Sequence, residues 1–370
     1  MSWGSRRWLQ HIQGNADDAA SAVEEYLHPA SFPGDVQEFF SSAEETSIEF
    51  GTTWYRNLVD TVYPCHDGVR FYILRRDGHP VAALPVLIDK SAVGKHVKSL
   101  ANYYSALYAP IIAPGLDIAA LVPLIRAIRT RHAPLGSFRF APMDPQSPGY
   151  GLLREAMQAS GLATFRFYCF GNWFLPVQGR WSAYLAGRDG KLRNTIKRMG
   201  KKFSADGGTM ESVDGGPGLE HALKAYERVY AASWKIAEPF TGFVPGLIRA
   251  CAERGWLRLG VAWLKNEPIA AQIWIVAGGK ASIYKLAYHQ DYKAYAPGTL
   301  LTAMLMQQVM ERDHVAEVDY LIGDDPYKQS WMSDRRERWG LIAYDPWTIS
   351  GLIGLIREMA SRIAKRLKSR

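Results

Sequence analysis

The stretch that decides the fold is Tyr284-Lys-Leu-Ala-Tyr-His-Gln-Asp-Tyr-Lys-Ala-Tyr-Ala-Pro-Gly-Thr-Leu-Leu-Thr-Ala-Met-Leu-Met-Gln-Gln-Val-Met310. Its first part continues an alternating, aromatic-rich pattern that begins at Ser282 and is typical of a half-buried strand. From Pro297 onward the apolar residues recur three or four positions apart, as they do in a helix. The stretch therefore predicts a strand, a loop and the start of a helix.

The start of this helix is suited to binding an anion. Pro297 has no amide hydrogen to satisfy at a helix start, and Gly298 lets another molecule approach the backbone closely. The unpaired amides of the first turn and the positive end of the helix dipole both attract phosphate. A well-capped core helix explains the same residues equally well, because single glycines are weak motifs.

A second motif, Val318-Asp-Tyr-Leu-Ile-Gly-Asp-Asp-Pro-Tyr-Lys-Gln-Ser-Trp331, follows about twenty residues later. Together with residues 288–301 it resembles the GNAT acyltransferase superfamily, in the branch of the FemABX and CelD/BcsL-like proteins. In that branch a Tyr-x-x-x-Tyr-x-x-x-x-Pro-Gly-x-Leu-Leu segment precedes an aspartate-bearing strand and a Gly-acidic-x-x-Tyr-Lys-x-x-Trp segment. The resemblance extends loosely back to about Arg180, and it suggests a bacterial ceramide synthase-like acyltransferase as one specific case.

The resemblance implies an α/β (α+β) fold of two tandem GNAT-like domains, each a mixed, mostly antiparallel sheet flanked by helices. The order of predicted elements in the first half recurs in the second, with hairpins at Asp77-Gly78 and at residues 265–268. The predicted parts are a lead-in (1–34), an N-terminal GNAT-like domain that is degenerate and shapes the acceptor side (35–178), a basic linker helix (179–205), a C-terminal GNAT domain with the acyl-CoA site (206–346) and a basic amphipathic helix (347–370).

Composition sets wide limits on function. The chain has 370 residues and a formal net charge of +8, which favours anionic partners without distinguishing a nucleotide, a nucleic acid or an acidic lipid. Cys65, Cys169 and Cys251 are far apart and no histidines cluster at ligand spacing, which argues against a disulfide framework or a metal site. No signal peptide or membrane-spanning run is apparent, so we expect a cytoplasmic protein.

The resemblance also implies the cosubstrate. We expect acyl-CoA to bind as a cosubstrate, with no permanently bound cofactor and no metal. Its pyrophosphate would lie at the helix start and its pantetheine arm along the preceding strand. The residues predicted to bind it are Tyr288, Pro297, Gly298, Thr299, Leu300 and Leu301.

The implied chemistry is acyl transfer from a thioester to an amine, by an enzyme that transfers groups other than aminoacyl groups. His289, at the exit of the strand, is the first candidate for the base, although a surface loop histidine fits equally well. Asp319 is a candidate for the base or for orienting the acceptor ammonium. Tyr327 is the candidate acid for the leaving thiolate, and Lys328 suits an electrostatic clamp better than a base.

Two further groups of residues are predicted to bind substrate. Arg193 and Lys197, on the basic linker helix, lie on one side at four-residue spacing and are expected to neutralise a phosphate-bearing ligand. A solvated linker helix is the alternative, and no nucleic-acid-binding module accompanies the basic run. Trp234 is expected to wall the acceptor pocket, although an aromatic residue at a helix end is often part of the core.

The C-terminal helix gives the one clue to the acceptor. Its apolar positions lie on one face, and the rest carries six basic residues against Glu358, which suggests either a membrane-surface helix or packing on the first domain. The membrane interpretation favours a lipid amine, specifically a sphingoid base, and a peripheral location on the inner face of the membrane. The alternatives are acetylation of an amino sugar or other envelope polysaccharide precursor, aminoacyl transfer from tRNA to a peptidoglycan precursor, and a non-catalytic exopolysaccharide assembly protein. The apolar positions are Ile349, Leu352, Ile353, Ile356, Ala360, Ile363 and Leu367, and the basic ones are Arg357, Arg362, Lys365, Arg366, Lys368 and Arg370.

Overall fold

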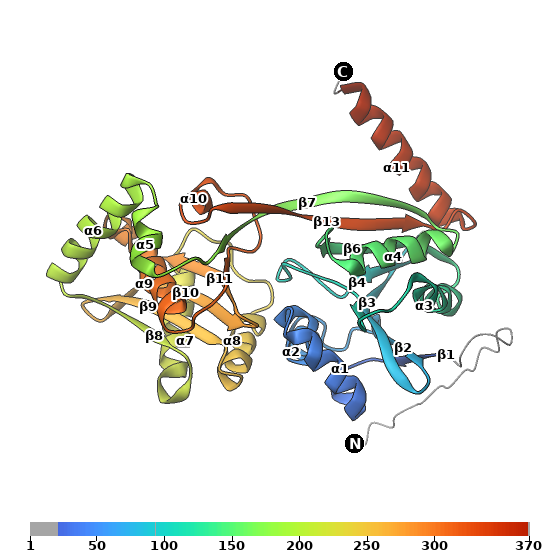
Figure 1. The fold of residues 1–370 in the computed structure, drawn as a ribbon, viewed down its shortest axis with the longest axis horizontal. Helices are drawn as coiled ribbons and strands as arrows, with labels where there is room; N and C mark the ends of the chain where they lie inside the picture. Colours follow the sequence, from blue (N-terminus) through green and yellow to red (C-terminus); the bar gives the residue numbers. More distant parts are fainter. Residues whose placement is uncertain (1–20, 93, 369–370) are drawn as a thin grey trace. The chain divides into compact units, whose positions relative to one another are not determined.

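The structure is a computed structural model that describes residues 21–92 and 94–368 (Figure 1). Contacts within the chain divide it into two compact units. Unit 1 contains the described parts of residues 1–59, 63–169 and 337–370, and unit 2 contains residues 60–62 and 170–336. Strands β7 (Ala163–Pro176) and β13 (Asp334–Tyr344) each contribute residues to both units.

The sheet of unit 1 has the strand order β1-β2-β3-β4-β6-β13, and the short β5 pairs with β3. All of these pairs are antiparallel except β4 with β6. The β2–β3 hairpin turns at Asp77 and Gly78, whose positive φ angles of 52° and 80° suit the tight turn predicted there. The strands not yet bounded are β1 (Ser21–Tyr26), β2 (Val69–Arg76), β3 (His79–Ser91), β4 (Gly94–Ser99), β5 (Ile111–Ile112) and β6 (Leu135–Met143).

Helices cover the sheet of unit 1 and close its core. Leu124 and Ile128 of α3 and Leu153 and Met157 of α4 are fully buried against strand residues such as Phe138. The helices are α1 (Gly34–Glu44), α2 (Thr52–Val62), α3 (Ile118–Arg131), α4 (Pro148–Ala159) and α11 (Ile349–Lys368), with 3-10 turns η1 (Pro29–Ser31) and η2 (Ile48–Phe50).

Helix α11 begins against β6 of unit 1 and then extends away from the sheet (Figure 1). A Cβ at Gly351 would meet the backbone oxygen of Asp345 at 2.0 Å, so only glycine fits this contact. Further along, Arg362 donates to the backbone oxygen of Arg166 at 2.8 Å and pairs with Glu358. The predicted apolar face points away from these contacts, and Ile356 and Ile363 are more than half exposed. Of the two alternatives for this helix, packing of the apolar face on the first domain is the one that the structure does not show.

The sheet of unit 2 has the strand order β7-β12-β11-β10-β9-β8. All pairs are antiparallel except β11 with β12. A second tight turn, with positive φ at Lys265 and Asn266, joins β9 to β10 as the sequence predicted. The strands of this sheet, apart from β7, are β8 (Gly208–Val213), β9 (Leu257–Leu264), β10 (Glu267–Ala277), β11 (Lys280–Tyr288) and β12 (Glu317–Asp319).

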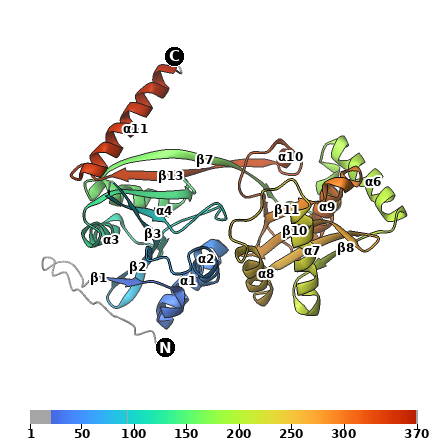
Figure 2. The same ribbon diagram turned by 180° about the vertical axis from the view of Figure 1, so that it is seen from behind.

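Helices cover both faces of this sheet (Figure 2). Its central strand β10 is therefore buried over almost its whole length. Leu301 and Leu305 of α9 contact one face at Gly260, and α7 packs against β9, β10 and β11. Helix α6 packs on α9. The helices are α5 (Trp181–Ala186), α6 (Gly190–Ala205), α7 (Leu219–Ala231), α8 (Phe243–Glu253), α9 (Pro297–Glu311) and α10 (Pro326–Gln329), with 3-10 turns η3 (Gly216–Gly218) and η4 (Gln290–Tyr295).

The predicted fold class is confirmed, since each unit is a mixed, mostly antiparallel sheet flanked by helices. The lead-in is a partial error. Residues 1–20 lie outside the described residues, but residues 21–26 form strand β1, which ion pairs from Glu24 and Glu25 to arginines of β2 hold in place. The basic segment 179–205 forms α5 and α6 within unit 2, and residues 337–346 belong to unit 1.

Candidate active site

Strands β11 and β12 separate in the middle of unit 2. They pair only from Lys280 to Ser282, opposite residues 317–319. Beyond that point β12 ends, while β11 continues for six residues to Tyr288 with only β10 as its partner. One backbone edge of β11 therefore opens where the two strands part.

A bulge interrupts β11 at the start of this open edge. Ile273 faces Lys285 and Trp274 faces Ile283, so Tyr284 is an extra residue that has no partner on β10. After the bulge, the amide of His289 donates to the Ile269 carbonyl at 2.9 Å. Because successive amides of a strand point to opposite sides, those of Leu286 and Tyr288 point to the open edge. The edge thus presents backbone donors to a ligand.

The N-terminus of α9 follows this edge and is fixed by polar contacts. Ala296, the residue before the helix, has a left-handed φ of 49°, and the amides of Thr299 and Leu300 donate to its carbonyl. The buried Gln272 of β10 donates to the Gly298 carbonyl at 2.9 Å and to Thr302 Oγ1 at 2.8 Å. Trp274 Nε1 in turn donates to Gln272 Oε1 at 2.8 Å. Sequence reasoning missed Gln272, although it is the polar residue within an apolar strand.

The residues predicted to bind the cosubstrate are close together here. Pro297, Leu300 and Leu301 are buried, whereas Tyr288, Gly298 and Thr299 are partly exposed. A Cβ at Gly298 would approach Tyr288 Cδ1 to 3.4 Å, which puts the tyrosine ring directly beside the helix start.

The basic helix α6 lies beside this helix start. A Cβ at Gly200 of α6 would lie 3.8 Å from Leu300 Cδ2, and the Lys202 ammonium is 4.6 Å from the centre of the Tyr295 ring. The predicted residues Arg193 and Lys197 are exposed on the same helix. The helix therefore brings positive charge to the region of α9, through Lys202 most directly.

Asp319, predicted to take part in proton transfer, is buried in a network of hydrogen bonds. Its carboxylate accepts from Asn172 Nδ2 at 2.6 Å, from the Leu321 amide at 2.7 Å and from Arg336 Nη2 at 2.5 Å. Burial alone would raise the pKa of Asp319, but the charge of Arg336 and these hydrogen bonds hold the pKa below its usual value. A carboxylate that is this well paired is a poor base, so the geometry favours a structural role.

Lys328 is buried and holds the loop after β12. Its ammonium donates to the carbonyls of Ile322 and Gly323 and lies 3.4 Å from Asp325 Oδ2. The loop needs this clamp because Leu321 has a left-handed φ of 53°, which an ordinary side chain rarely adopts. Burial lowers the pKa of Lys328, and the neighbouring carboxylates oppose that shift. Lys328 therefore holds the backbone of this loop, and its role as an electrostatic clamp in catalysis stays a prediction.

Comparison with known proteins identifies this unit. The family model of the acetyltransferase (GNAT) domain matches residues 190–329, which include β11, α9, β12 and α10. The chain carries a GNAT domain. No curated protein matches it in sequence.

Solved structures agree with this assignment at the level of the fold. FemX is 12% identical over 90% of this chain and 99% of its own, with a TM-score of 0.59. The C-terminal domain of an Agrobacterium fabrum protein assigned as a lysylphosphatidylglycerol synthetase is 13% identical over 89% of this chain and 95% of its own, with a TM-score of 0.54. The fold of the chain is thus similar to that of FemX, which agrees with the resemblance stated from the motifs.

Tyr327 lies on the first turn of α10 in the GNAT domain and is about half exposed. Its ring meets Tyr320 edge to face, with the ring centres 5.7 Å apart. Partial burial, and then the charge of Asp325, raise the pKa of Tyr327 to about 12. The hydroxyl therefore stays protonated at neutral pH and suits a hydrogen-bond donor.

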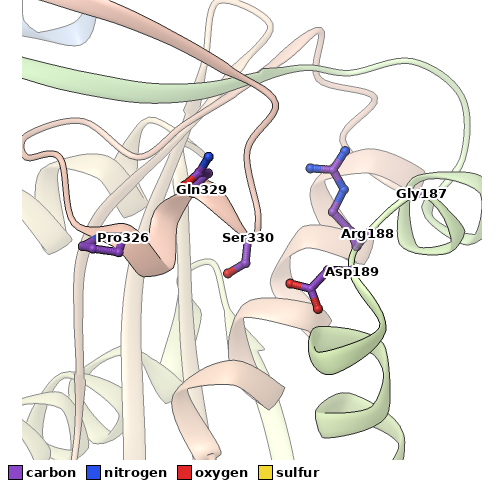
Figure 3. Close-up of a pocket in the computed structure, with 6 residues that line it drawn as sticks. All are labelled: Gly187, Arg188, Asp189, Pro326, Gln329 and Ser330. Atoms are coloured by element: carbon purple, nitrogen blue, oxygen red, sulfur yellow. The ribbon is translucent and has the colours of Figure 1, made fainter.

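A pocket of about 400 Å³ opens between α10 and the link from α5 to α6 (Figure 3). A neighbouring pocket of about 410 Å³ shares Gly187 and Arg188 with it. The Arg188 guanidinium is 4.9 Å from the centre of the Tyr184 ring. None of the predicted site residues lines either pocket among the residues that the structure describes.

His289 caps the 3-10 turn η4 at the end of β11. Its Nδ1 accepts from the Asp291 amide at 3.3 Å, and its ring lies against Tyr292. It lies five residues beyond the bulge at Tyr284, roughly 16 Å along an extended strand. The position is beside the start of α9, and it is too distant for direct proton transfer at the bulge.

The other face of β11 carries charged side chains under the connection from α7 to α8. Lys285 forms an ion pair with Glu238, and both side chains are less than one-fifth exposed. Trp234, from the same connection, packs on Tyr288 with the ring centres 4.6 Å apart. Trp234 thus walls the edge of β11, and it is half exposed and outside the core.

Within residues 21–92 and 94–368, no three histidine, cysteine or acidic side chains group in a way that could hold a metal ion. In the same residues, no helix is both long and apolar enough to cross a membrane.

Proposed function

We propose that the GNAT domain transfers an acyl group from acyl-CoA to a primary amine. The observation that carries the proposal is the open, bulged edge of β11 leading to the N-terminus of α9. Tyr284 and Tyr288 are four residues apart, roughly 13 Å along the strand, a span comparable to an extended pantetheine arm. With the pyrophosphate at the helix start, the thioester would lie near the bulge.

The chemistry follows from this alignment. The free amine attacks the thioester carbon, and the carbonyl oxygen becomes an oxyanion that a backbone amide freed by the bulge stabilises. Collapse of this intermediate forms the amide bond and breaks the carbon–sulfur bond. The attacking nitrogen gives up one proton to water, and the leaving thiolate takes up one proton. A donor such as the Tyr327 hydroxyl, which regains its proton from water, assists the departure of the thiolate. We assign His289 to the phosphate end of the cosubstrate and not to proton transfer.

We further propose that the acceptor is a lipid amine of the sphingoid type. The support is the exposed apolar face of α11, which would hold the enzyme where such an amine presents its head group. The names of the structural relatives suggest aminoacyl transfer instead, in which the donor is an aminoacyl-tRNA.

The deciding experiment is incubation of the protein with palmitoyl-CoA or acetyl-CoA and a panel of amines, read by mass spectrometry. The N-palmitoyl derivative of a sphingoid amine, free or phosphorylated, is the expected product. An acetylated amino sugar would overturn the lipid assignment, a product formed only from aminoacyl-tRNA would overturn the cosubstrate assignment, and no product from any donor would favour a non-catalytic protein.

The cosubstrate site is tested by Gly298→Val. The added side chain would lie where the backbone must approach the pyrophosphate, and we expect at least about tenfold weaker binding of CoA in calorimetry. Gly190→Val is the matched control, because Gly190 begins the neighbouring helix α6 and has open space around its Cβ position. Unchanged CoA affinity in a folded Gly298→Val protein would move the site elsewhere.

The proton donor is tested by Tyr327→Phe. Loss of a hydrogen bond to the developing thiolate is expected to lower kcat by about tenfold or more, with little change in KM for acyl-CoA. His289→Ala should do the reverse and raise the KM for acyl-CoA while leaving kcat nearly unchanged. A fall in kcat for His289→Ala alone would return that histidine to the role of base.

A further inference from the structure

A lysine beside Trp234 forms no ion pair with any residue that the structure describes. Lys235 lies in the connection from α7 to α8, and its ammonium is 5.9 Å from the centre of the Trp234 ring. Among the described residues, no hydrogen bond or ion pair reaches this ammonium. Charged groups that are half-buried in this way are normally paired, because desolvation penalises a lone charge.

The neighbourhood of Lys235 is positive. Lys285 of β11 is nearby and forms an ion pair with Glu238. Together the two lysines and the one carboxylate carry a net charge of +1. Burial, followed by the charge of Lys285, lowers the pKa of Lys235, and Glu238 offsets that shift in part. Lys328 and Asp325 also act on Lys235 with opposite signs, so they leave the net charge around it at +1. The cluster therefore lacks one negative charge.

The cluster also lies close to the reacting edge. Lys285 follows the bulge at Tyr284 directly, and Trp234, the neighbour of Lys235, packs on Tyr288 at the other end of the open edge. The connection itself is anchored, since the Tyr230 hydroxyl donates to the Ile236 carbonyl at 3.1 Å. A ligand group held by Lys235 would thus belong to the molecule that meets the thioester from this face.

We infer that Lys235 binds an anionic oxygen group, a phosphate or a carboxylate, that the acceptor carries beside its amine. This inference rests on the proposed acyl transfer and narrows its acceptor to amines that are also acids. Lys285 also attracts the anion while it keeps its ion pair with Glu238. The bound anion supplies the missing charge and fixes the amine relative to the bulge, where the carbon–nitrogen bond forms.

The test compares soluble short-chain sphinganine with its 1-phosphate, by calorimetry on the protein saturated with CoA. We expect the phosphate to bind at least about tenfold more tightly, and Lys235→Ala to remove that preference while Lys235→Arg keeps most of it. Lys224→Ala is the matched control, because Lys224 is an exposed lysine of α7 whose loss removes the same charge.

Each other outcome overturns the inference. Equal binding of the two amines to the wild-type protein, or an equal loss for both in Lys235→Ala, would mean that Lys235 recognises no anion. If Lys235→Ala instead weakens only the binding of an acyl-CoA with a terminal carboxylate, the anion that Lys235 binds belongs to the acyl group. Calorimetry measures binding and does not require product formation. The inference about Lys235 can therefore be tested even if the protein forms no N-acyl product.

Discussion

Replacing Arg336 with methionine is expected to lower the free energy of unfolding by about 3–5 kcal/mol. The guanidinium pairs with the buried Asp319, bonds to Glu317, and donates from Nε to Asn172 Oδ1 at 2.7 Å. Methionine fills much of the same volume but leaves the Asp319 carboxylate buried without its countercharge. Urea denaturation followed by tryptophan fluorescence measures the loss.

The matched control is Arg335→Met, one residue earlier on the same strand. Arg335 pairs with Asp324 at the surface, and such an exposed pair is worth less than about 1 kcal/mol. A loss of similar size in both variants would contradict the special role of the Asp319 network.

The loss of stability in Arg336→Met has two possible causes, the missing countercharge of Asp319 and the lost packing of the arginine side chain. The pH dependence of the loss separates these two causes. In the wild-type protein the pKa of Asp319 is lowered, so its stabilisation is present above the ordinary aspartate pKa of about 4 and is lost as the pH falls below it. In Arg336→Met, burial dominates and raises the pKa of Asp319. The variant therefore loses most stability at neutral pH, and the difference from wild type should narrow as the pH approaches 4. A difference that stays constant with pH would show that lost packing, and not charge, causes the effect.

Local chemistry explains which parts of the fold could be predicted. The hairpins at Asp77-Gly78 and Lys265-Asn266 were predictable because the residues of the turn themselves determine the backbone conformation. Strand β1 was not predictable in this way. Its pairing depends on arginines of β2 some fifty residues away, and a short segment with two glutamates shows no strand pattern by itself.

The difference between local signals and contacts of distant residues also explains which residues of the candidate site could be predicted. Pro297 and Gly298 were recognised because a helix start is a local signal. Gln272, which fixes that start, lies on another strand, and only the register of β10 against α9 reveals its partner. Asp319 was predicted to be the base or to orient the acceptor ammonium, because its countercharge, Arg336, comes from a strand that the motif does not include. A buried carboxylate and a catalytic one look alike until their partners are known.

Helix α11 presents an apolar face that the fold leaves uncovered. Its glycines and Glu358 face unit 1, so the packing that normally buries an amphipathic helix is inverted here. Trp347, just before the helix, is 85% exposed and suits the membrane interface, where tryptophan is favoured. One of the predicted basic side chains, Arg362, pairs with Glu358 and donates to the Arg166 carbonyl. Arg357, Lys365 and Arg366 are exposed.

Ile356→Glu is expected to weaken association with anionic vesicles by about a hundredfold. Burial of the isoleucine side chain in the interface contributes about 1.5–3 kcal/mol, and a carboxylate near the anionic lipids adds about 1 kcal/mol of repulsion. Because Ile356 is exposed and glutamate favours helices, the fold should be unaffected. Ser361→Glu, which adds the same charge away from the apolar face, is the control, and vesicle sedimentation is the measurement. In Ile356→Glu the apparent KM for an amine in vesicles should rise while that for a soluble short-chain amine stays the same. Equal vesicle binding by the two variants would exclude membrane docking by this face and remove the main support for a lipid acceptor.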